Sequence, residues 1–241
     1  MLCEAAKLID AVADDPAAKV AQWRPPNPYV STDRSFNLAQ TWLTECHSSH
    51  SLCRLDPVSF MPTRLIRIDP RDSRASIQLV ETKVGELLRW CSLSYVWGGD
   101  QPVKTTKATL TFNRQGIPIT ELPQTIQDAV TVSRRLGVYY LWVDCLCIVQ
   151  DDPNDIAREL AVMPHIYKHA FLTISASCAK SSDDGFLQDR GYFYTSVPPF
   201  RLRYQSSADE PGTLFMFESS PGNLDEDPIE SRCWTYQERL F

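Results

Sequence analysis

A nearly continuous apolar run occupies residues 139–149 and reads Tyr139-Tyr140-Leu141-Trp142-Val143-Asp144-Cys145-Leu146-Cys147-Ile148-Val149. Such a run is typical of a strand that is covered on both faces of a parallel sheet. Asp144 must find a partner or face a crevice, because burying an unpaired carboxylate is costly. It is therefore either a structural aspartate or a site residue near the carboxyl end of a strand. Cys145 and Cys147 alternate with Leu146, which would place both thiols on one face of the strand as core residues.

The segments around this run alternate between strand-like and helix-like patterns. Pro123 suits the first turn of a helix that Gly137 terminates, and Asp152 suits the N-cap of the next helix. The elements predicted in chain order are a strand at 92–96, a helix at 123–136, a strand at 139–149, a helix at 153–167 kinked at Pro164, and a strand at 171–177. This alternation predicts an α/β fold with a parallel sheet flanked by helices.

The outer parts of the chain add further elements to this predicted sheet. The Ala, Leu and Val spacing of residues 1–23 predicts a helix, which a proline-rich stretch at 25–28 ends. A second helix is predicted at 35–45 from its apolar stripe. Two hairpins are predicted, one from strands at 64–68 and 77–80 and one from strands at 200–204 and 213–218.

Composition limits the domain organisation and the class of protein. The 241 residues are 43% hydrophobic, which favours one substantial domain at 61–241 preceded by a helical extension and linker at 1–60. The net charge of −6 argues against nucleic acid as a partner. No apolar run approaches the ~20 residues of a membrane helix, so no membrane association is expected. Glu4, Lys7 and Asp10 interrupt any export signal, which predicts a cytoplasmic location with mostly reduced thiols.

Two groups of cysteines and histidines suggest chemistry of their own. Cys46, His47, His50 and Cys53 are four potential zinc ligands, but structural zinc sites usually divide their ligands between two separated pairs. Metal binding and ordinary packing at a helix end both remain open for this cluster, and packing is favoured. A cysteine hydrolase that pairs Cys145 or Cys147 with His165 or His169 is a further alternative, although nothing nearby in the sequence would lower a thiol pKa.

Three blocks, in this order, resemble the motifs of one protein family. The first is Leu93-Ser94-Tyr95-Val96-Trp97-Gly98, the second runs from Leu122 to Asp151, and the third is Arg232-Cys233-Trp234-Thr235-Tyr236-Gln237-Glu238. Together they resemble the fungal heterokaryon incompatibility (HET) domain, over a region from about residue 62 to the end of the chain. The resemblance implies a role in fungal non-self recognition and regulated cell death.

The HET domain is in turn similar to the Toll/interleukin receptor (TIR) domain, which implies a flavodoxin-like parallel sheet. In enzymatic TIR domains a glutamate shortly after a tryptophan serves NAD cleavage, and the matching position here is Glu238. The resemblance thus implies that Glu238 is catalytic and that NAD is a substrate, with no cofactor or metal required. The residues expected to bind NAD are Ser94, Tyr95, Trp97, Gly98, Asp144, Trp234 and Gln237.

The chemistry of NAD cleavage is compatible with a single carboxylate. The leaving nicotinamide is already a cationic pyridinium, so its departure needs no general acid, and one carboxylate can stabilise the oxocarbenium-like ribose. Trp97 or Trp234 could stack on a ring of the nucleotide, although each could equally be a core anchor. The chain has no G-x-G-x-x-G fingerprint for phosphates, which argues against a dehydrogenase.

A non-catalytic function fits the same expected fold. In this alternative the chain is a signalling module that associates with itself or with a partner protein, and the tryptophans and Glu238 serve structure or an interface.

Overall fold

The computed structural model describes residues 6–10, 15–21, 29–50, 60–69, 76–83, 85–189, 200–205 and 210–219. The chain divides into two compact units. One unit comprises Asp33–Leu187 together with Asp227–Phe241, and the other comprises Met1–Thr32 together with Gln188–Glu226. The domain boundary predicted at residue 60 stays a prediction.

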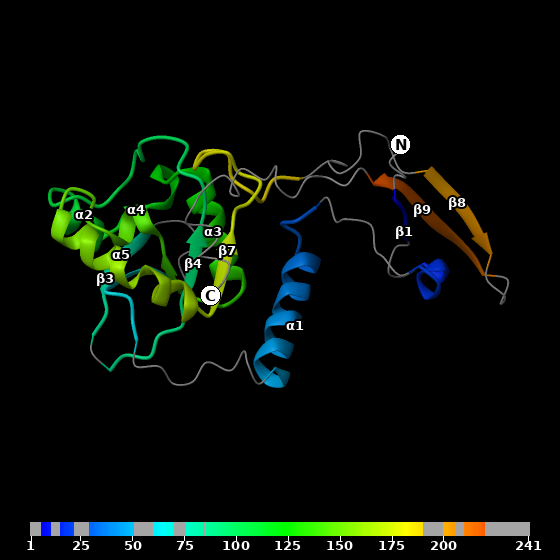
Figure 1. The fold of residues 1–241 in the computed structure, drawn as a ribbon, viewed down its shortest axis with the longest axis horizontal. Coiled ribbons are helices and arrows are strands. Elements are labelled where there is room, and N and C mark those ends of the chain that lie inside the picture. The colour runs from blue at the N-terminus through cyan, green and yellow to red at the C-terminus, as the bar shows by residue number, and fades with distance from the viewer. Residues whose placement is uncertain are drawn as a thin grey trace. The chain divides into compact units, whose positions relative to one another are not determined.

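The larger unit contains a mixed six-stranded sheet with the order β5-β3-β2-β6-β4-β7 (Figure 1). Its strands are β2 (Arg64–Ile68), β3 (Ser76–Glu81), β4 (Cys91–Ser94), β5 (Ile117–Pro118), β6 (Tyr140–Trp142) and β7 (Leu172–Ser175). Strands β6 and β7 both pair with β4 in parallel, whereas β2, β3 and β5 are joined by antiparallel pairing. The α/β class and the first hairpin are therefore confirmed. The expectation of a parallel sheet is corrected, because the hairpin extends the sheet through pairing of β2 with β6.

The three parallel strands are wound in two directions from β4. In chain order they lie second, first, third across the sheet, so the chain moves from β4 to one side and then crosses to the other. Cys91 of β4 lies against Ser133 of helix α3 (Gln124–Arg135). On β6, Trp142 lies opposite Ser92, the residue after Cys91, so its side chain points to the other face of the sheet. There it packs edge-on against Tyr167 of helix α5 (Pro153–Lys168). Helices α3 and α5 thus cover opposite faces of these strands, as side chains alternate between faces along a strand.

The apolar run at 139–149 is only partly a strand. Strand β6 ends at Trp142, and Asp144–Cys147 form a one-turn helix, α4, which begins right after Val143. Cys145 and Cys147 are fully buried core residues, as predicted, but they lie on a helical turn and not on one face of a strand. In the sequence, the continuous apolar run resembles one long strand, because periodicity cannot distinguish a buried strand from a buried helical turn.

The remaining helices of this unit agree with the sequence except for two short elements. Helix α1 (Asp33–Ser49) extends the predicted helix at 35–45, and α3 and α5 match their predictions closely. Pro123 caps α3 rather than starting it, whereas Asp152 caps α5 as expected, by accepting a hydrogen bond from the Asn154 amide. Helix α2 (Leu110–Gln115) and the 3-10 helix η3 (Ile119–Glu121) were not predicted.

The smaller unit contains a three-stranded antiparallel sheet of order β1-β9-β8. Its elements are β1 (Ala6–Asp10), the 3-10 helix η1 (Pro16–Lys19), β8 (Phe200–Gln205) and β9 (Pro211–Ser219). The second predicted hairpin is confirmed by the pairing of β8 with β9. The helix predicted for residues 1–23 is wrong at residues 6–10, because they pair with residues 215–219 as a strand, whereas residues 16–19 form the short 3-10 helix η1. A partner that is distant in sequence overrode the local pattern.

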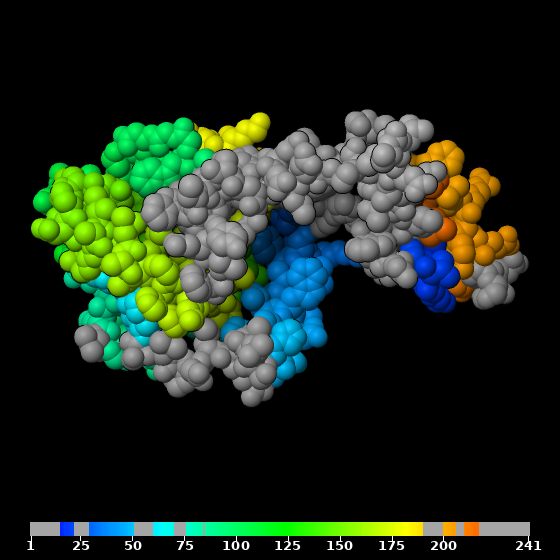
Figure 2. Space-filling view, in the orientation of Figure 1, coloured from blue at the N-terminus to red at the C-terminus, as the bar shows by residue number. Residues whose placement is uncertain are grey.

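The core of the larger unit gathers around β4, β6 and β2, where Leu65, Leu93, Leu141 and Trp142 are almost completely buried. In the space-filling view, side chains close the gaps that separate the ribbons of this unit (Figure 2). Within the described part of the chain, no helix combines the length and the apolar character that a membrane crossing needs.

Candidate functional site

The predicted site residues of the first two blocks lie at the carboxyl ends of the parallel strands. Ser94 is the last residue of β4, and its carbonyl accepts a hydrogen bond of 2.9 Å from the Ala176 amide, just after β7. Tyr95, Trp97 and Gly98 follow β4, and Asp144 follows β6. This is the edge at which doubly wound sheets bind ligands, outside the carboxyl ends of strands where the winding changes direction.

The side chains of Trp97 and Asp144 contact each other directly. The indole Nε1 of Trp97 donates a hydrogen bond of 2.9 Å to Oδ2 of Asp144. The other carboxylate oxygen, Oδ1, accepts a bond of 2.7 Å from the Cys145 amide at the start of α4. Both groups are half-buried. Asp144 is therefore a hydrogen-bonded carboxylate that orients the Trp97 ring and still reaches the surface, so its structural and site interpretations are compatible.

Tyr95 and Cys145 form a buried layer beneath this pair. Burial, and then the charge of Asp144, raises the pKa of the Tyr95 phenol well above its usual value. The same two causes raise the pKa of the Cys145 thiol, and burial raises the pKa of Cys147 to about 12. All three groups are therefore protonated at neutral pH. The cysteine-hydrolase alternative loses its thiolate nucleophile, and His165 and His169 stack on each other and pack at a tilt against Phe60 instead.

Gly98 lies in a close contact between two loops. Its φ is +74°, and a Cβ atom there would lie 2.3 Å from the Cβ of Ser181. The Ser182 amide also donates a bond of 3.2 Å to the Trp97 carbonyl. The loops that follow β4 and β7 are therefore packed together, which leaves the Gly98 backbone in contact with protein. Gly98 itself is exposed, and the contact of Trp97 with Asp144, after β4 and β6, is half-buried.

The third block lies outside the described residues. Glu238, Trp234 and Gln237 belong to the region after residue 219. The structure thus brings Trp97 and Asp144 together from separate blocks, with Tyr95 beneath them. The roles assigned to all of these residues, and to Ser94 and Gly98, stay predictions.

The cluster of potential zinc ligands is distributed along and after α1. Cys46 and His47 lie within the helix and His50 follows its end, while Cys53 lies outside the described residues. His47 stacks on Phe171 with ring centroids 4.3 Å apart. Across the residues that the structure describes, no three histidine, cysteine or acidic side chains gather closely enough to hold a metal ion.

A buried ion-pair network behind α4 was missed in the sequence. Arg64 of β2 donates from Nη2 to Asp155 and from Nε to the Cys147 carbonyl, the latter at 2.6 Å. Asp155 also accepts a bond of 2.8 Å from the Val149 amide, and Glu159 lies 3.5 Å from Arg64 Nη2. The network thus holds the backbone on either side of Ile148, in the segment that leads from Asp144 into α5. The sequence signal was an arginine in an apolar strand and two acids at i and i+4 on α5.

The pKa of Asp155 reflects two opposing effects. Burial alone would raise it, but the hydrogen bonds from Arg64 and from the Val149 amide, together with the nearby positive charges, outweigh burial and hold it below its usual value. The carboxylate is therefore charged at neutral pH, as an ion pair with Arg64 requires.

Comparison with known proteins identifies the family of the chain. A search of curated proteins and a search of solved structures each find no match to it. The family model described as heterokaryon incompatibility protein (HET) matches residues 90–238, which is more than half of the 241 residues. The match contains β4, β6 and β7, both residues of the Trp97–Asp144 pair, and the third block up to Glu238. The chain therefore belongs to the heterokaryon incompatibility (HET) family.

Proposed function

We propose that this chain acts in fungal heterokaryon incompatibility by cleaving NAD⁺, with Glu238 as the catalytic carboxylate and the Trp97–Asp144 pair as part of the nucleotide site. The observation that carries the proposal is the hydrogen bond between Trp97 and Asp144. It joins residues of two separate blocks at the edge of the sheet where doubly wound folds bind nucleotides. Membership of the HET family supports the biological role, and regulated cell death would follow from loss of NAD⁺.

The order of the parallel strands supports the proposed relation to TIR domains. The second-first-third arrangement of β6, β4 and β7 is the order with which flavodoxin-like sheets begin. The antiparallel strands β2, β3 and β5 are an addition to that plan. The likeness rests on strand order alone, and we propose it as the reason why Glu238 should take the role of the TIR glutamate.

In the proposed reaction, the carboxylates of Glu238 and Asp144 have different roles. Water attacks C1′ of the nicotinamide ribose, the N-glycosyl bond breaks, and its electron pair stays on the ring nitrogen. The products are nicotinamide, ADP-ribose and one proton. Glu238 would stabilise the positive charge that develops on the ribose, where it is worth most. Asp144, held by the Trp97 indole and the Cys145 amide, would accept hydrogen bonds from the nucleotide, and Trp97 offers a ring face for stacking.

The test is release of nicotinamide from NAD⁺ by the purified chain, measured over a range of protein concentrations. We expect Glu238→Gln to reduce kcat by roughly 10²-fold or more, because it removes the charge that stabilises the transition state. Asp144→Asn and Trp97→Phe should mainly raise KM. Glu230→Ala is the matched control, since it removes a neighbouring glutamate outside the motif.

Two outcomes would contradict the proposal. If the wild-type chain releases no nicotinamide even when concentrated, the enzymatic function is wrong and the alternative of a non-catalytic, self-associating signalling module stands. If wild type is active and Glu238→Gln matches it, NAD⁺ cleavage stands but the assignment of Glu238 is wrong.

A further inference from the structure

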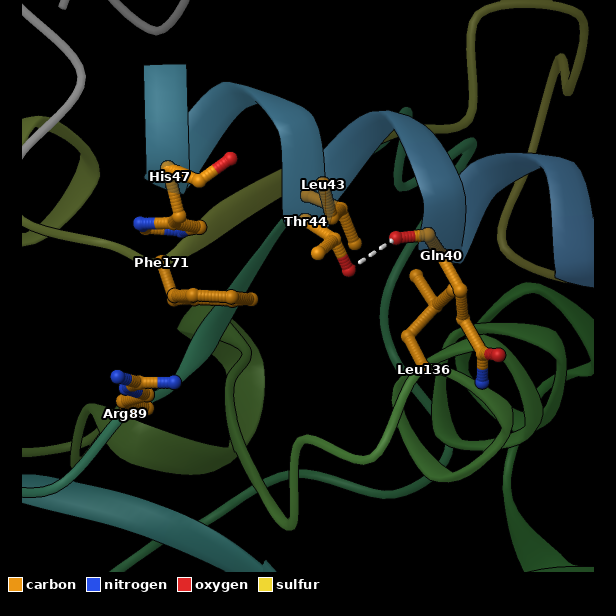
Figure 3. Close-up of a pocket in the computed structure, with 8 residues that line it drawn as sticks. Gln40, Leu43, Thr44, His47, Arg89, Leu136 and Phe171 are labelled. Carbon is orange, nitrogen blue, oxygen red and sulfur yellow. Dashed lines mark hydrogen bonds between the residues drawn. The ribbon is translucent and has the colours of Figure 1, made fainter. Parts of the chain in front are cut away.

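A cavity lies between α1 and the sheet body, away from the Trp97–Asp144 pair. Its volume is about 570 Å³, within the range of small-molecule sites. Figure 3 shows side chains of α1 facing Phe171, Arg89 and Leu136 across this space. The residues that line it are Gln40, Leu43, Thr44, His47, Ser48, Arg89, Leu136 and Phe171.

Phe171 is the centre of a three-layer stack on one wall of the cavity. The imidazole of His47 lies 4.3 Å from its ring centroid with an interplanar angle of 5°. The guanidinium carbon of Arg89 lies 5.2 Å from the same centroid. In the close-up, His47, Phe171 and Arg89 follow one another as parallel layers (Figure 3). Stacking on an aromatic ring leaves the edge of a guanidinium open to other partners, since its N–H groups lie in its plane.

The lining of the cavity includes the positively charged Arg89 and no acidic residue, although the protein as a whole is acidic. The chain carries a net charge of −6, yet none of the eight lining residues is Asp or Glu. No carboxylate among the described residues forms an ion pair with Arg89. Guanidinium groups of arginine carry a positive charge at physiological pH. The cavity therefore presents a fixed positive charge that no acid in the described part of the chain neutralises.

The other polar residues of the lining have defined partners. Gln40 donates from Nε2 to the Arg135 carbonyl at 2.7 Å, and Thr44 donates from Oγ1 to the Gln40 carbonyl at 2.8 Å. Leu43 and Leu136 are half-buried and supply an apolar surface. A ligand that fits this lining has one anionic group for Arg89 and His47 and an apolar part for the leucines.

We propose that this cavity is a binding site for a small amphiphilic anion, in which a carboxylate or phosphate meets the edge of Arg89 and an apolar body packs on Leu43 and Leu136. Because α1 forms one wall and the sheet body the other, the bound ligand ties α1 to the body. The site is separate from the proposed NAD⁺ site and does not depend on it.

The test uses phenyl phosphate and benzoate as probes, with benzamide as a neutral analogue of the same size. Binding to the purified chain is measured by ligand-observed NMR titration. We expect both anions to bind and benzamide to bind at least about tenfold more weakly, because a charge-assisted hydrogen bond is lost. Comparison of the two anions shows whether phosphate or carboxylate is preferred.

The variant arm compares Arg89→Gln with Arg67→Gln. Arg67 is an exposed arginine of β2 that does not line the cavity, so both variants lose one positive charge. We expect Arg89→Gln to weaken anion binding about tenfold or more and Arg67→Gln to leave it unchanged. An independent readout is hydrogen exchange of the α1 amides, which should slow when phenyl phosphate is added to wild type.

Three results would overturn the proposal. They are no binding of either anion at millimolar concentration, equal binding of benzamide, or binding that Arg89→Gln does not weaken. If Arg89→Gln fails to fold, two wild-type measurements decide the question. They are the comparison of the anions with benzamide and the hydrogen exchange of the α1 amides. Loss of NAD⁺ cleavage would leave this inference standing, because neither readout involves turnover.

Discussion

At the scale of single residues, Gly98 shows how the absence of a side chain sets the distance between two loops. From its motif, Gly98 was expected to contribute to NAD binding. Its φ is +74°, a backbone conformation that favours glycine. The contact with Ser181 adds a second requirement, because a Cβ atom would meet both the side chain and the backbone of that residue. Both demands come from protein packing, which is independent of any ligand.

We predict that Gly98→Ala destabilises the protein and Gly99→Ala does not. The alanine at 98 has to adopt a left-handed conformation and also displaces Ser181, so a loss of about 2–4 kcal/mol in unfolding free energy is expected. A Cβ at Gly99 meets nothing within 4 Å, so that variant should stay within about 0.5 kcal/mol of wild type. Urea unfolding followed by circular dichroism measures both. Equal stability of the two variants would contradict the close contact.

At the scale of elements, helix α3 holds the loop that follows β7. Asp128 of α3 accepts hydrogen bonds from the amides of Phe186 and Leu187, at 2.6 and 3.0 Å. Thr125, one turn earlier, accepts a bond of 3.1 Å from the Gly185 amide. The loop that packs on Gly98 is thus fixed by side chains of a helix for which the sequence predicted only the position, at 123–136.

We predict that Asp128→Ala frees this loop while α3 itself stays folded. The buried Phe186 amide and the half-buried Leu187 amide lose their acceptor, which costs about 1–3 kcal/mol for a buried amide. Hydrogen exchange of the Phe186 and Leu187 amides should accelerate strongly, whereas amides in the middle of α3 should change little. Asp183→Ala is the control, because its side chain is exposed on the same loop. Unchanged exchange at both amides in Asp128→Ala would disprove the role of the carboxylate.

At the scale of the whole molecule, the network of Arg64, Asp155 and Glu159 joins the antiparallel and parallel parts of the larger unit. Arg64 comes from the added hairpin, whereas both acids come from α5, which covers the parallel strands. Arg64 and Asp155 also bond to the backbone on either side of Ile148. The network thereby fixes the segment that leads from Asp144 into α5.

We predict that Asp155→Ala costs about 3–5 kcal/mol at neutral pH, since it leaves Arg64 buried without its main partner. The pKa of Asp155 is lowered in the folded state, so its stabilisation is present above the unfolded value of about 3.9 and is lost as pH falls through the folded value. The stability difference between wild type and variant should therefore narrow below about pH 4. Urea midpoints measured from pH 7 to pH 3 test this expectation, with Asp183→Ala as the control. A difference that stays constant over this range would contradict the assigned cause.

Local patterns predicted those elements whose signals are complete within the segment itself. Helix α5 carries its own N-cap and proline, α3 carries its own apolar face and terminating glycine, and both hairpins have turn residues between β-prone strands. The family blocks are likewise local, which is why the HET resemblance can be recognised in the sequence alone. Trp97 and Asp144 were predicted only as members of one set of NAD-binding residues, and the hydrogen bond between them was not foreseen.

The misjudged elements depend on partners far along the chain. Residues 6–10 form a strand because residues 215–219 lie beside them, and the sheet is mixed because β2 finds β6. Sequence by itself determined the family, the α/β class and the main helices, and it predicted the edge of the sheet where the candidate site lies, since these follow from periodicity, caps and ordered motifs. Only the tertiary structure decided the end of β6 at Trp142, the bond from Trp97 to Asp144 and the cavity beside Arg89. Each of those arises from contacts between segments that no local pattern records.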